Sequence, residues 1–148
     1  MIYLDNSAST KPRKEVIDVL VQTLEENYAN PDAIHDFSHK SLLKIKNAKK
    51  TVADYLKVEA DRIYFTAGGG DGNNLVLQGI INANSRTKKH LVTTKIEHPS
   101  VYEVFRHYEN IGFEVDYLNV DKDGFVNLEE LENAIREDTA IVSIGAVN

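Results

Sequence analysis

The amino-acid sequence predicts an α/β fold in which a mainly parallel sheet is flanked by helices. Short apolar runs alternate with helical patterns along all 148 residues, which is typical of strands that alternate with helices. One of these apolar runs is joined to the next helical pattern by a glycine-rich loop. No proline- or serine-rich linker, internal repeat or low-complexity stretch interrupts the chain. We therefore expect residues 1–148 to form a single α/β unit.

Two helices are expected in the first third of the chain. Pro12 suits the first position of a helix, and apolar residues recur at helical spacing over roughly 13–27. The Asn-Pro pair at 30–31 breaks the chain after this helix. A second apolar stripe extends over 38–56 with lysines on the opposite face, so this helix should pack on one side only.

The middle of the chain predicts two strands, each followed by a helix. Residues 62–66 are rich in β-forming side chains and end in the glycine loop 67–72, after which helical spacing begins near residue 72. Residues 90–94 predict another strand. The His-Pro pair at 98–99 opens the next helix, because proline fits the first helical turn.

The last third of the chain predicts two more strands and a capped helix. Residues 113–117 alternate apolar and acidic side chains, as a half-buried strand or a strand at a sheet edge does. Asn127 suits a helix cap, and Glu130 follows three residues later as in a capping box. Residues 140–144 are apolar on both faces, which predicts a central parallel strand covered by helices.

The composition is that of a globular protein, with 42% hydrophobic and 27% charged residues. No apolar run is as long as a membrane span, and the first residues lack the features of a secretory signal, so we expect a cytoplasmic protein without membrane contact. A net charge of −6 disfavours nucleic acid as a partner. The absence of cysteine excludes disulfides, thiolate–metal sites and a cysteine nucleophile supplied by this chain.

The glycine loop 67–72 carries the strongest local signal for a ligand. Glycines between a strand and a helix allow backbone N–H groups to converge on an anion at the positive end of the helix dipole, which suits a phosphate. Asn73 occupies the place of the third glycine of a dinucleotide-binding fingerprint, and no Gly-Lys-Ser/Thr completes a P-loop. The alternative interpretation is a tight turn without a ligand.

His98 is the second candidate, because it follows the end of a predicted strand. The carboxyl ends of parallel strands share one edge of the sheet, so the imidazole should stand at the same edge as the glycine loop. The alternative for a lone histidine is a helix cap or a solvated side chain.

Two further patterns partly resemble metal sites. Residues 119–130 place oxygen-bearing side chains, a glycine and a final glutamate nearly as a calcium-binding EF-hand loop does. Asn119 at the first position and the strand-like residues before it favour instead an Asp-Gly turn that leads into a capped helix. His35 and His39 are four residues apart but lack an HExxH pattern. We expect no metal site.

Five segments, taken together, match the pattern of a known family. They are residues 2–10 (Ile-Tyr-Leu-Asp-Asn-Ser-Ala-Ser-Thr), the Asn30-Pro31 pair with His35, residues 63–69 (Ile-Tyr-Phe-Thr-Ala-Gly-Gly), residues 93–99 (Thr-Thr-Lys-Ile-Glu-His-Pro), and the last residues from Ser143 to Asn148. In order and spacing, essentially the whole chain resembles the cysteine desulfurases of the NifS/IscS type. These enzymes are class V aminotransferase-like, fold-type-I pyridoxal phosphate proteins.

The resemblance implies the N-terminal portion of a large, cofactor-binding domain. It implies the conversion of L-cysteine into L-alanine, with the sulfur left as a persulfide on an enzyme cysteine for iron–sulfur cluster assembly or other sulfur pathways. Pyridoxal phosphate would be the cofactor, a sulfur-acceptor protein the partner, and the enzyme a homodimer. Gly69 and Gly70 would bind the cofactor phosphate. His98 would stack on the pyridine ring and move protons, and residues 6–8 would lie near the substrate carboxylate.

The chain also departs from the family pattern. The family usually has a threonine in place of Gly70, whose hydroxyl donates to the phosphate, and a glutamate in place of Asp71. The family motif Val-Asn-Asn-Glu is present only as far as Asn148, and the Schiff-base lysine and the sulfur-accepting cysteine follow later in the family. We therefore expect an N-terminal fragment that is inactive by itself. The alternatives are a selenocysteine lyase, another class V aminotransferase, or a non-catalytic remnant of the fold.

Overall fold

The computed structural model of the chain describes residues 2–147. The chain divides into two compact units, Met1–Tyr64 and Phe65–Asn148, and each has its own arrangement of elements. The expectation of a single α/β unit over residues 1–148 stays a prediction. Asn148, where the family motif would continue, lies outside the described residues.

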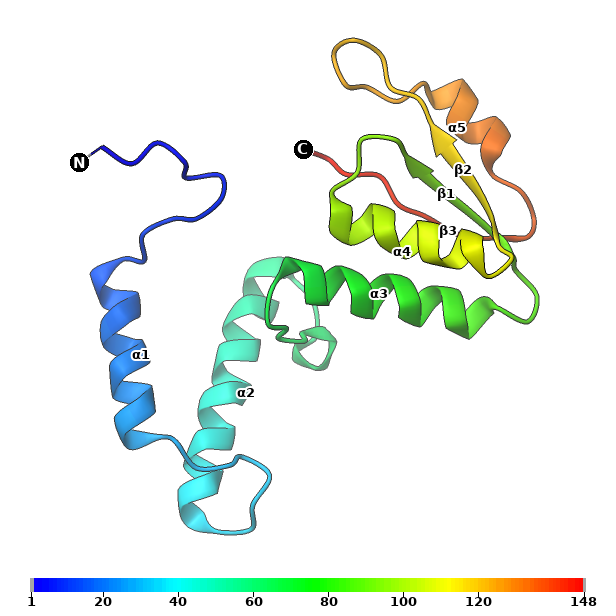
Figure 1. Ribbon diagram of the computed structural model, residues 1–148. Helices are drawn as coiled ribbons and strands as arrows, with labels where there is room; N and C mark the ends of the chain where they lie inside the picture. Colours follow the sequence, from blue (N-terminus) through cyan, green and yellow to red (C-terminus); the bar gives the residue numbers. More distant parts are fainter. Residues whose placement is uncertain (1, 148) are drawn as a thin grey trace. The chain divides into compact units, whose positions relative to one another are not determined.

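The first unit contains the two predicted helices (Figure 1). Helix α1 spans Lys14–Glu26 and helix α2 spans Asp36–Leu56, so both predictions are confirmed. His35 caps α2, because its Nδ1 accepts a hydrogen bond from the Ser38 N–H at 3.2 Å. His35 and His39 therefore lie at the start of a helix. The His35 ring accepts a hydrogen bond from an N–H group of the first turn that has no acceptor within the helix.

The predicted strand at residues 62–66 is wrong. A short 3₁₀ helix, η1, spans Ala60–Arg62. Residues 63–66, which follow it, belong to no strand in the described chain. β-forming side chains favour an extended backbone, but a strand also needs a neighbour whose N–H and C=O groups complete the ladder. Ile63 is indeed extended (φ −94°, ψ 123°), whereas Tyr64 and Phe65 remain 73% and 56% exposed. The sequence thus predicted the local conformation and not the pairing.

The sheet lies in the second unit and is parallel, as predicted. Its strands are β1 (His90–Thr94), β2 (Glu114–Leu118) and β3 (Thr139–Val142), in the order β2-β1-β3. Both outer strands run parallel to β1. β2 alternates in burial along its length, as expected for a strand at a sheet edge.

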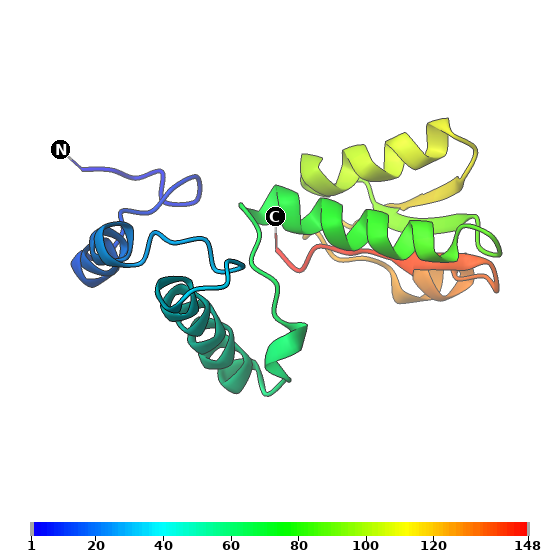
Figure 2. The same cartoon turned by 90° about the horizontal axis from the view of Figure 1, so that it is seen from below.

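Helices cover both faces of this sheet (Figures 1 and 2). Helices α3 (Gly69–Asn84) and α4 (Pro99–Asn110) lie on one face, and helix α5 (Leu128–Ala134) lies on the other. The second unit therefore confirms the predicted fold class, a mainly parallel sheet flanked by helices. In the described part of the chain, no helix is long and apolar enough to cross a membrane.

The prediction that residues 140–144 form a central strand is wrong for the described chain. β3 pairs with β1 alone and lies at an edge, while β1 is central and is buried along its whole length. Val142 and Ile144 remain 38% and 39% exposed. Apolar side chains on both faces indicate that other elements must pack against both faces of a strand, but they do not specify which elements these are or whether the strand is central.

The core of the second unit lies between the sheet and the helices α3 and α4. Ile81 of α3, Leu91 of β1 and Phe105 of α4 are completely buried. The Tyr108 hydroxyl donates a hydrogen bond to Asn82 Oδ1 at 2.9 Å and so joins α4 to α3. This packing holds the beginnings of both helices at the carboxyl edge of the sheet, where the candidate site lies.

Candidate functional site at the carboxyl edge of the sheet

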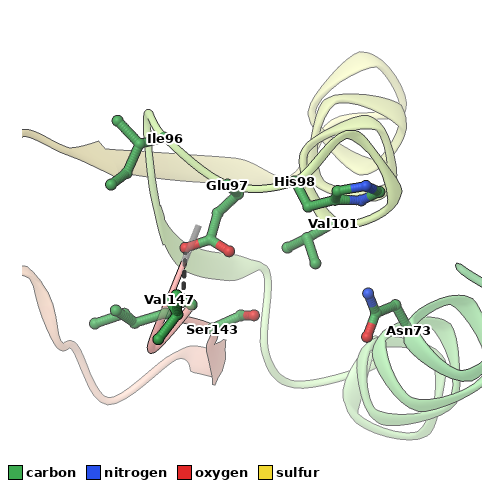
Figure 3. Close-up of a pocket in the computed structure, with 9 residues that line it drawn as sticks. Asn73, Ile96, Glu97, His98, Val101, Ser143 and Val147 are labelled. Atoms are coloured by element: carbon green, nitrogen blue, oxygen red, sulfur yellow. Dashed lines mark hydrogen bonds between the residues drawn. The ribbon is translucent and has the colours of Figure 1, made fainter. Parts of the chain in front are cut away.

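A cavity of about 300 Å³ lies at the carboxyl edge of the sheet (Figure 3). The loops that follow β1 and β3 form two of its walls, and the N-terminal parts of α3 and α4 contribute the remainder. This is the edge at which parallel α/β sheets bind their ligands. The lining residues are Asn73, Ile96, Glu97, His98, Val101, Ser143, Ile144, Gly145 and Val147.

The glycine loop leads directly into α3, which begins at Gly69 and so earlier than the predicted start near residue 72. The Gly72 N–H donates to the Gly68 carbonyl at 3.0 Å as the first helical hydrogen bond. The N–H groups of Gly69 and Gly70 precede this bond and have no helical acceptor. They are the donors that an anion at the positive end of α3 would need. Neither glycine lines the cavity itself, whereas Asn73, one turn further along α3, does.

The glycines of this loop leave open space beside the backbone. A Cβ added at Gly68 or Gly69 would meet no atom within 4 Å, and at Gly70 the nearest atom would be Ser100 Cβ at 3.7 Å. The left-handed region, which favours glycine, is occupied at Gly112 and Gly124 but at none of these three. These glycines are therefore not required by a left-handed backbone conformation. Their lack of a side chain instead allows a ligand to approach the backbone closely.

His98 caps α4 and also lines the cavity. Its Nδ1 accepts a hydrogen bond from the Ser100 N–H at 3.1 Å and lies 2.8 Å from Ser100 Oγ. This geometry confirms the helix cap that the sequence left open as an alternative. The cap uses Nδ1 alone, and among residues 2–147 no group bonds to Nε2. The ring therefore remains available to a ligand in the cavity.

Glu97 connects the two loops that form the cavity walls, a role that the sequence analysis missed. One oxygen of its carboxylate, Oε1, accepts hydrogen bonds from the Thr94 hydroxyl and from the Gly145 N–H, both at 2.8 Å. Thr94 is buried at the end of β1, and Gly145 belongs to the loop after β3. The only available signal was the position of Glu97 within the Lys-Ile-Glu-His-Pro segment, which revealed no partner.

Asn73 is a second residue that the sequence analysis missed, since it was noted only as the place of an absent glycine. Its Nδ2 donates to Ser100 Oγ at 2.9 Å, which links the second turn of α3 to the first turn of α4. The two residues are 27 positions apart, so no local pattern could have indicated the contact.

Residues 6–8 belong to the first unit, where they lie exposed in a turn in which the Ala8 N–H donates to the Asp5 carbonyl at 3.3 Å. Their expected place near a substrate carboxylate stays a prediction.

The loop that resembled a calcium site is an Asp-Gly turn. Asp121 Oδ1 accepts hydrogen bonds from the Asp123 and Phe125 N–H groups, both at 2.9 Å, and Gly124 has a left-handed φ of 87°. Asn127 then caps α5, as predicted. Within residues 2–147 no group of three or more His, Asp or Glu side chains is arranged to hold a metal ion.

One group with a strongly raised pKa, Tyr117, lies away from the cavity. Burial, followed by the nearby Glu109 carboxylate, raises the pKa of Tyr117 to about 12. The Tyr117 hydroxyl donates to Glu109 Oε2 at 3.2 Å. Tyr117 does not line the cavity, so its shift belongs to the packing of β2 against α4.

Comparison with known sequences decides the family. The sequence matches the family described as "Aminotransferase class-V" over residues 2–148. The chain belongs to this family. The chain is 44% identical over 147 residues to a cysteine desulfurase IscS of Methanosarcina thermophila, covering 99% of this chain and 36% of that protein. It is 40% identical over 148 residues to the mitochondrial cysteine desulfurase of Saccharomyces cerevisiae, covering 99% of this chain and 30% of that protein.

Solved structures agree with the sequence comparison. A NifS-like protein superposes with a TM-score of 0.93 at 34% identity, covering 97% of this chain and 39% of the other. A structure described as "SspA in complex with cysteine" superposes with a TM-score of 0.89 at 35% identity, covering 95% and 41%. The resemblance to the NifS/IscS proteins is thus confirmed. The chain spans less than half the length of these relatives and corresponds to their N-terminal portion.

Proposed function

We propose that this chain supplies the phosphate subsite and the ring subsite for pyridoxal phosphate in a cysteine desulfurase that acts on L-cysteine. The names of its relatives support this reaction, and one structural neighbour is described as a complex with cysteine. The observation that carries the proposal is local. The N–H groups at the start of α3, which have no acceptor within the helix, and the ring of His98 lie at the same edge of one parallel sheet.

The first turn of α3 is the proposed phosphate subsite. The N–H groups of Gly69 and Gly70 donate to the phosphate oxygens, and the helix dipole, equivalent to about half a positive charge, favours the anion. Asp71 lies in the same turn, but its Oδ2 accepts a hydrogen bond from the Ala67 N–H at 3.0 Å. Its carboxylate is therefore hydrogen-bonded to the loop backbone and holds the residues that precede α3 in place.

The imidazole of His98 is the proposed ring subsite. The hydrogen bonds to Ser100 hold one edge of the imidazole and leave its faces available for stacking against an aromatic cofactor. Nε2 is the atom at which the ring can donate a proton. When bound, pyridoxal phosphate supplies an electron sink for bond breaking in the amino acid, and the residues described here bind and orient it.

Gly70 weakens the proposed phosphate subsite. The family usually has threonine here, and the loss of a hydrogen bond to a charged group costs about 1.5–3 kcal/mol. We therefore expect phosphate or free pyridoxal phosphate to bind this chain with a Kd of roughly 0.1–1 mM.

We further propose that the 148 residues alone do not catalyse the reaction. Among the described residues that line the cavity, none is a lysine. Lys95 is the lysine nearest to His98 in sequence, and its Nζ donates to Asn119 Oδ1 at 2.9 Å on an exposed surface. Covalent attachment of pyridoxal phosphate needs a lysine that is desolvated or beside positive charge.

The wider proposal rests on the resemblance to the desulfurases alone. It includes a homodimer, transfer of sulfur to an acceptor protein, a contribution to iron–sulfur cluster assembly, and a cytoplasmic location.

Backbone NMR of the chain tests the binding proposal. Addition of phosphate should shift the amide signals of Gly68 to Gly72, and addition of pyridoxal phosphate should shift these signals together with the ring signals of His98. Chloride at the same ionic strength is the control and should shift neither set. Unchanged amide signals up to high phosphate would remove the proposed phosphate subsite.

A labelling experiment tests the proposed inactivity separately. After incubation with pyridoxal phosphate and borohydride reduction, peptide mapping should find no single lysine labelled in stoichiometric amount. Sulfide should form from L-cysteine no faster than with the free cofactor. Stoichiometric labelling of one lysine together with faster sulfide release would contradict inactivity and leave the phosphate subsite untouched.

A further inference from the structure

Three polar side chains form a relay beside the cavity, from α3 to α4. Asn73 Nδ2 donates to Ser100 Oγ at 2.9 Å, and Ser100 Oγ lies 2.8 Å from His98 Nδ1. The Ser100 N–H donates to the same nitrogen at 3.1 Å. In Figure 3, Asn73 and His98 approach the cavity from the two different helices.

The direction of each hydrogen bond in the relay follows from what each group can donate. A backbone N–H can only donate, so the Nδ1 of His98 accepts and carries no proton. Because Nδ1 carries no proton, the Ser100 hydroxyl must be the donor in its contact with Nδ1, while Ser100 Oγ accepts from the Asn73 amide. The neutral imidazole must then carry its proton on Nε2.

We propose that Asn73 and Ser100 are positioning residues that hold the His98 ring in one orientation and in the tautomer protonated at Nε2. The relay needs only this chain, whereas the benefit to a cofactor rests on the proposed function. A ring held in this way presents a proton donor and a fixed aromatic face to the cavity.

The relay also connects the two proposed subsites. Asn73 lies one turn after the N–H groups of Gly69 and Gly70, and Ser100 Cβ is the nearest atom to a Cβ built at Gly70. The same hydroxyl thus lies beside the glycine loop and against His98. Its bond to Asn73 sets the position of the ring relative to the phosphate donors.

NMR of the histidine ring tests the relay without any cofactor. At about pH 9, where imidazole is neutral, the ¹⁵N shifts of His98 should show a single tautomer with the proton on Nε2. Ser100→Ala removes the hydroxyl bond to Nδ1 and Asn73→Ala loosens it, so in both variants the Ser100 N–H remains as the main donor to Nδ1. Each variant should therefore weaken the preference for the tautomer protonated at Nε2 and make the ring more mobile. Ser100→Thr keeps a hydroxyl and should restore the original spectrum.

Asn82→Ala is the matched control. It removes another hydrogen bond between a side-chain amide on α3 and a hydroxyl on α4, that between Asn82 and Tyr108, at the far end of the same helix pair. This variant should leave the His98 ring signals unchanged, because the bond it removes does not touch the relay. A change in the His98 tautomer equal to that of Asn73→Ala would show a general effect of helix packing and overturn the proposal.

Asn73→Asp should have the largest effect. A carboxylate at position 73 can only accept, so it takes the Ser100 hydroxyl proton and leaves an Oγ lone pair facing Nδ1. The population protonated at Nδ1 should then exceed that in Asn73→Ala. A wild-type ring spectrum in Asn73→Asp and Ser100→Ala would overturn the relay, even if phosphate still shifted the Gly68 to Gly72 amides. Loss of those phosphate shifts with an intact ring response would instead remove the proposed function and leave the relay standing.

Discussion

Helix α1 of the first unit and helix α4 of the second are both amphipathic, but their burial is opposite. α4 packs Val104 and Phe105 into the core, whereas α1 has no buried residue. Val19 and Leu24 of α1 are 61% and 66% exposed. Apolar spacing therefore predicts a helix and the face that needs a partner, but it does not predict that the partner lies in the same chain.

The same contrast separates the residues proposed for function. Gly69 and His98 stand on elements whose positions are fixed by the packed core of the second unit. Residues 6–8 lie in an exposed turn of the first unit, held by short-range backbone and side-chain bonds. A site needs a packed framework to hold its groups in place, and the second unit provides it.

The largest expected effect is the loss of a core side chain in the packed helix. Phe105→Ala removes a fully buried ring and should lower the free energy of unfolding by about 3–5 kcal/mol. Leu24→Ala on α1 should change it by less than about 0.5 kcal/mol, because that side chain is already exposed. Denaturant unfolding of both variants measures the difference. Equal effects would show that α1 is packed in solution and would break the comparison.

The second effect concerns anion binding at two helix starts. Gly70→Thr should strengthen phosphate binding about tenfold, because a hydroxyl donor is added where the added Cβ has ordinary contact distance and φ is not left-handed. An NMR titration measures the affinity. The start of α2, where His35 already caps the helix and Asp36 adds negative charge, should not respond to phosphate.

Gly79→Thr is the control for this substitution. Position 79 lies inside α3 with open space around it, so the change affects helix propensity without adding a donor at the loop. Phosphate affinity should stay at the wild-type value. A tenfold loss of affinity in Gly70→Thr would reject the alignment of the loop with the family.

A third, smaller effect compares a capped helix with one that lacks a side-chain cap. Asn127 Oδ1 accepts hydrogen bonds from the N–H groups of Glu129 and Glu130 at 2.9 and 3.3 Å. Asn127→Ala should therefore cost about 1 kcal/mol of stability. Arg13 at the start of α1 makes no such bond, so Arg13→Ala should be close to neutral. Thermal unfolding of both variants measures the difference. A neutral Asn127→Ala would show that α5 does not depend on its cap.

A further expected effect is a pH dependence in the packed unit. The pKa of Tyr117 is raised to about 12 from its ordinary value of 10.0, so the folded state holds the phenol proton more tightly than the unfolded state. This contribution to stability is complete below pH 10 and is lost as the pH rises toward 12. Unfolding measured across this range should show the decline in wild type, and Tyr117→Phe should remove that component.

Glu109→Gln should remove only part of the decline, because it deletes the carboxylate and leaves the burial of Tyr117, which also raises the pKa. A decline unchanged by Tyr117→Phe would assign the pH dependence to other groups.

The sequence by itself determined the local structure of most elements. The apolar stripes located α1 and α2, the alternation at 113–117 located β2, and the His-Pro pair located the start of α4. These features depend on residues three or four positions apart, which a linear pattern records directly. The glycine loop and the resemblance to the family also predicted Gly69, Gly70 and His98 as residues that bind a cofactor at one edge of the sheet.

Only the tertiary structure decided how these elements meet. It placed β3 at an edge, left residues 63–66 without a strand partner, and brought Glu97 to Gly145 over a separation of 48 residues. It also brought Asn73 to Ser100, 27 residues away, and so determined the orientation of His98. Contacts of this kind depend on how the core packs and which helix faces meet, and a single sequence carries no local period that encodes them.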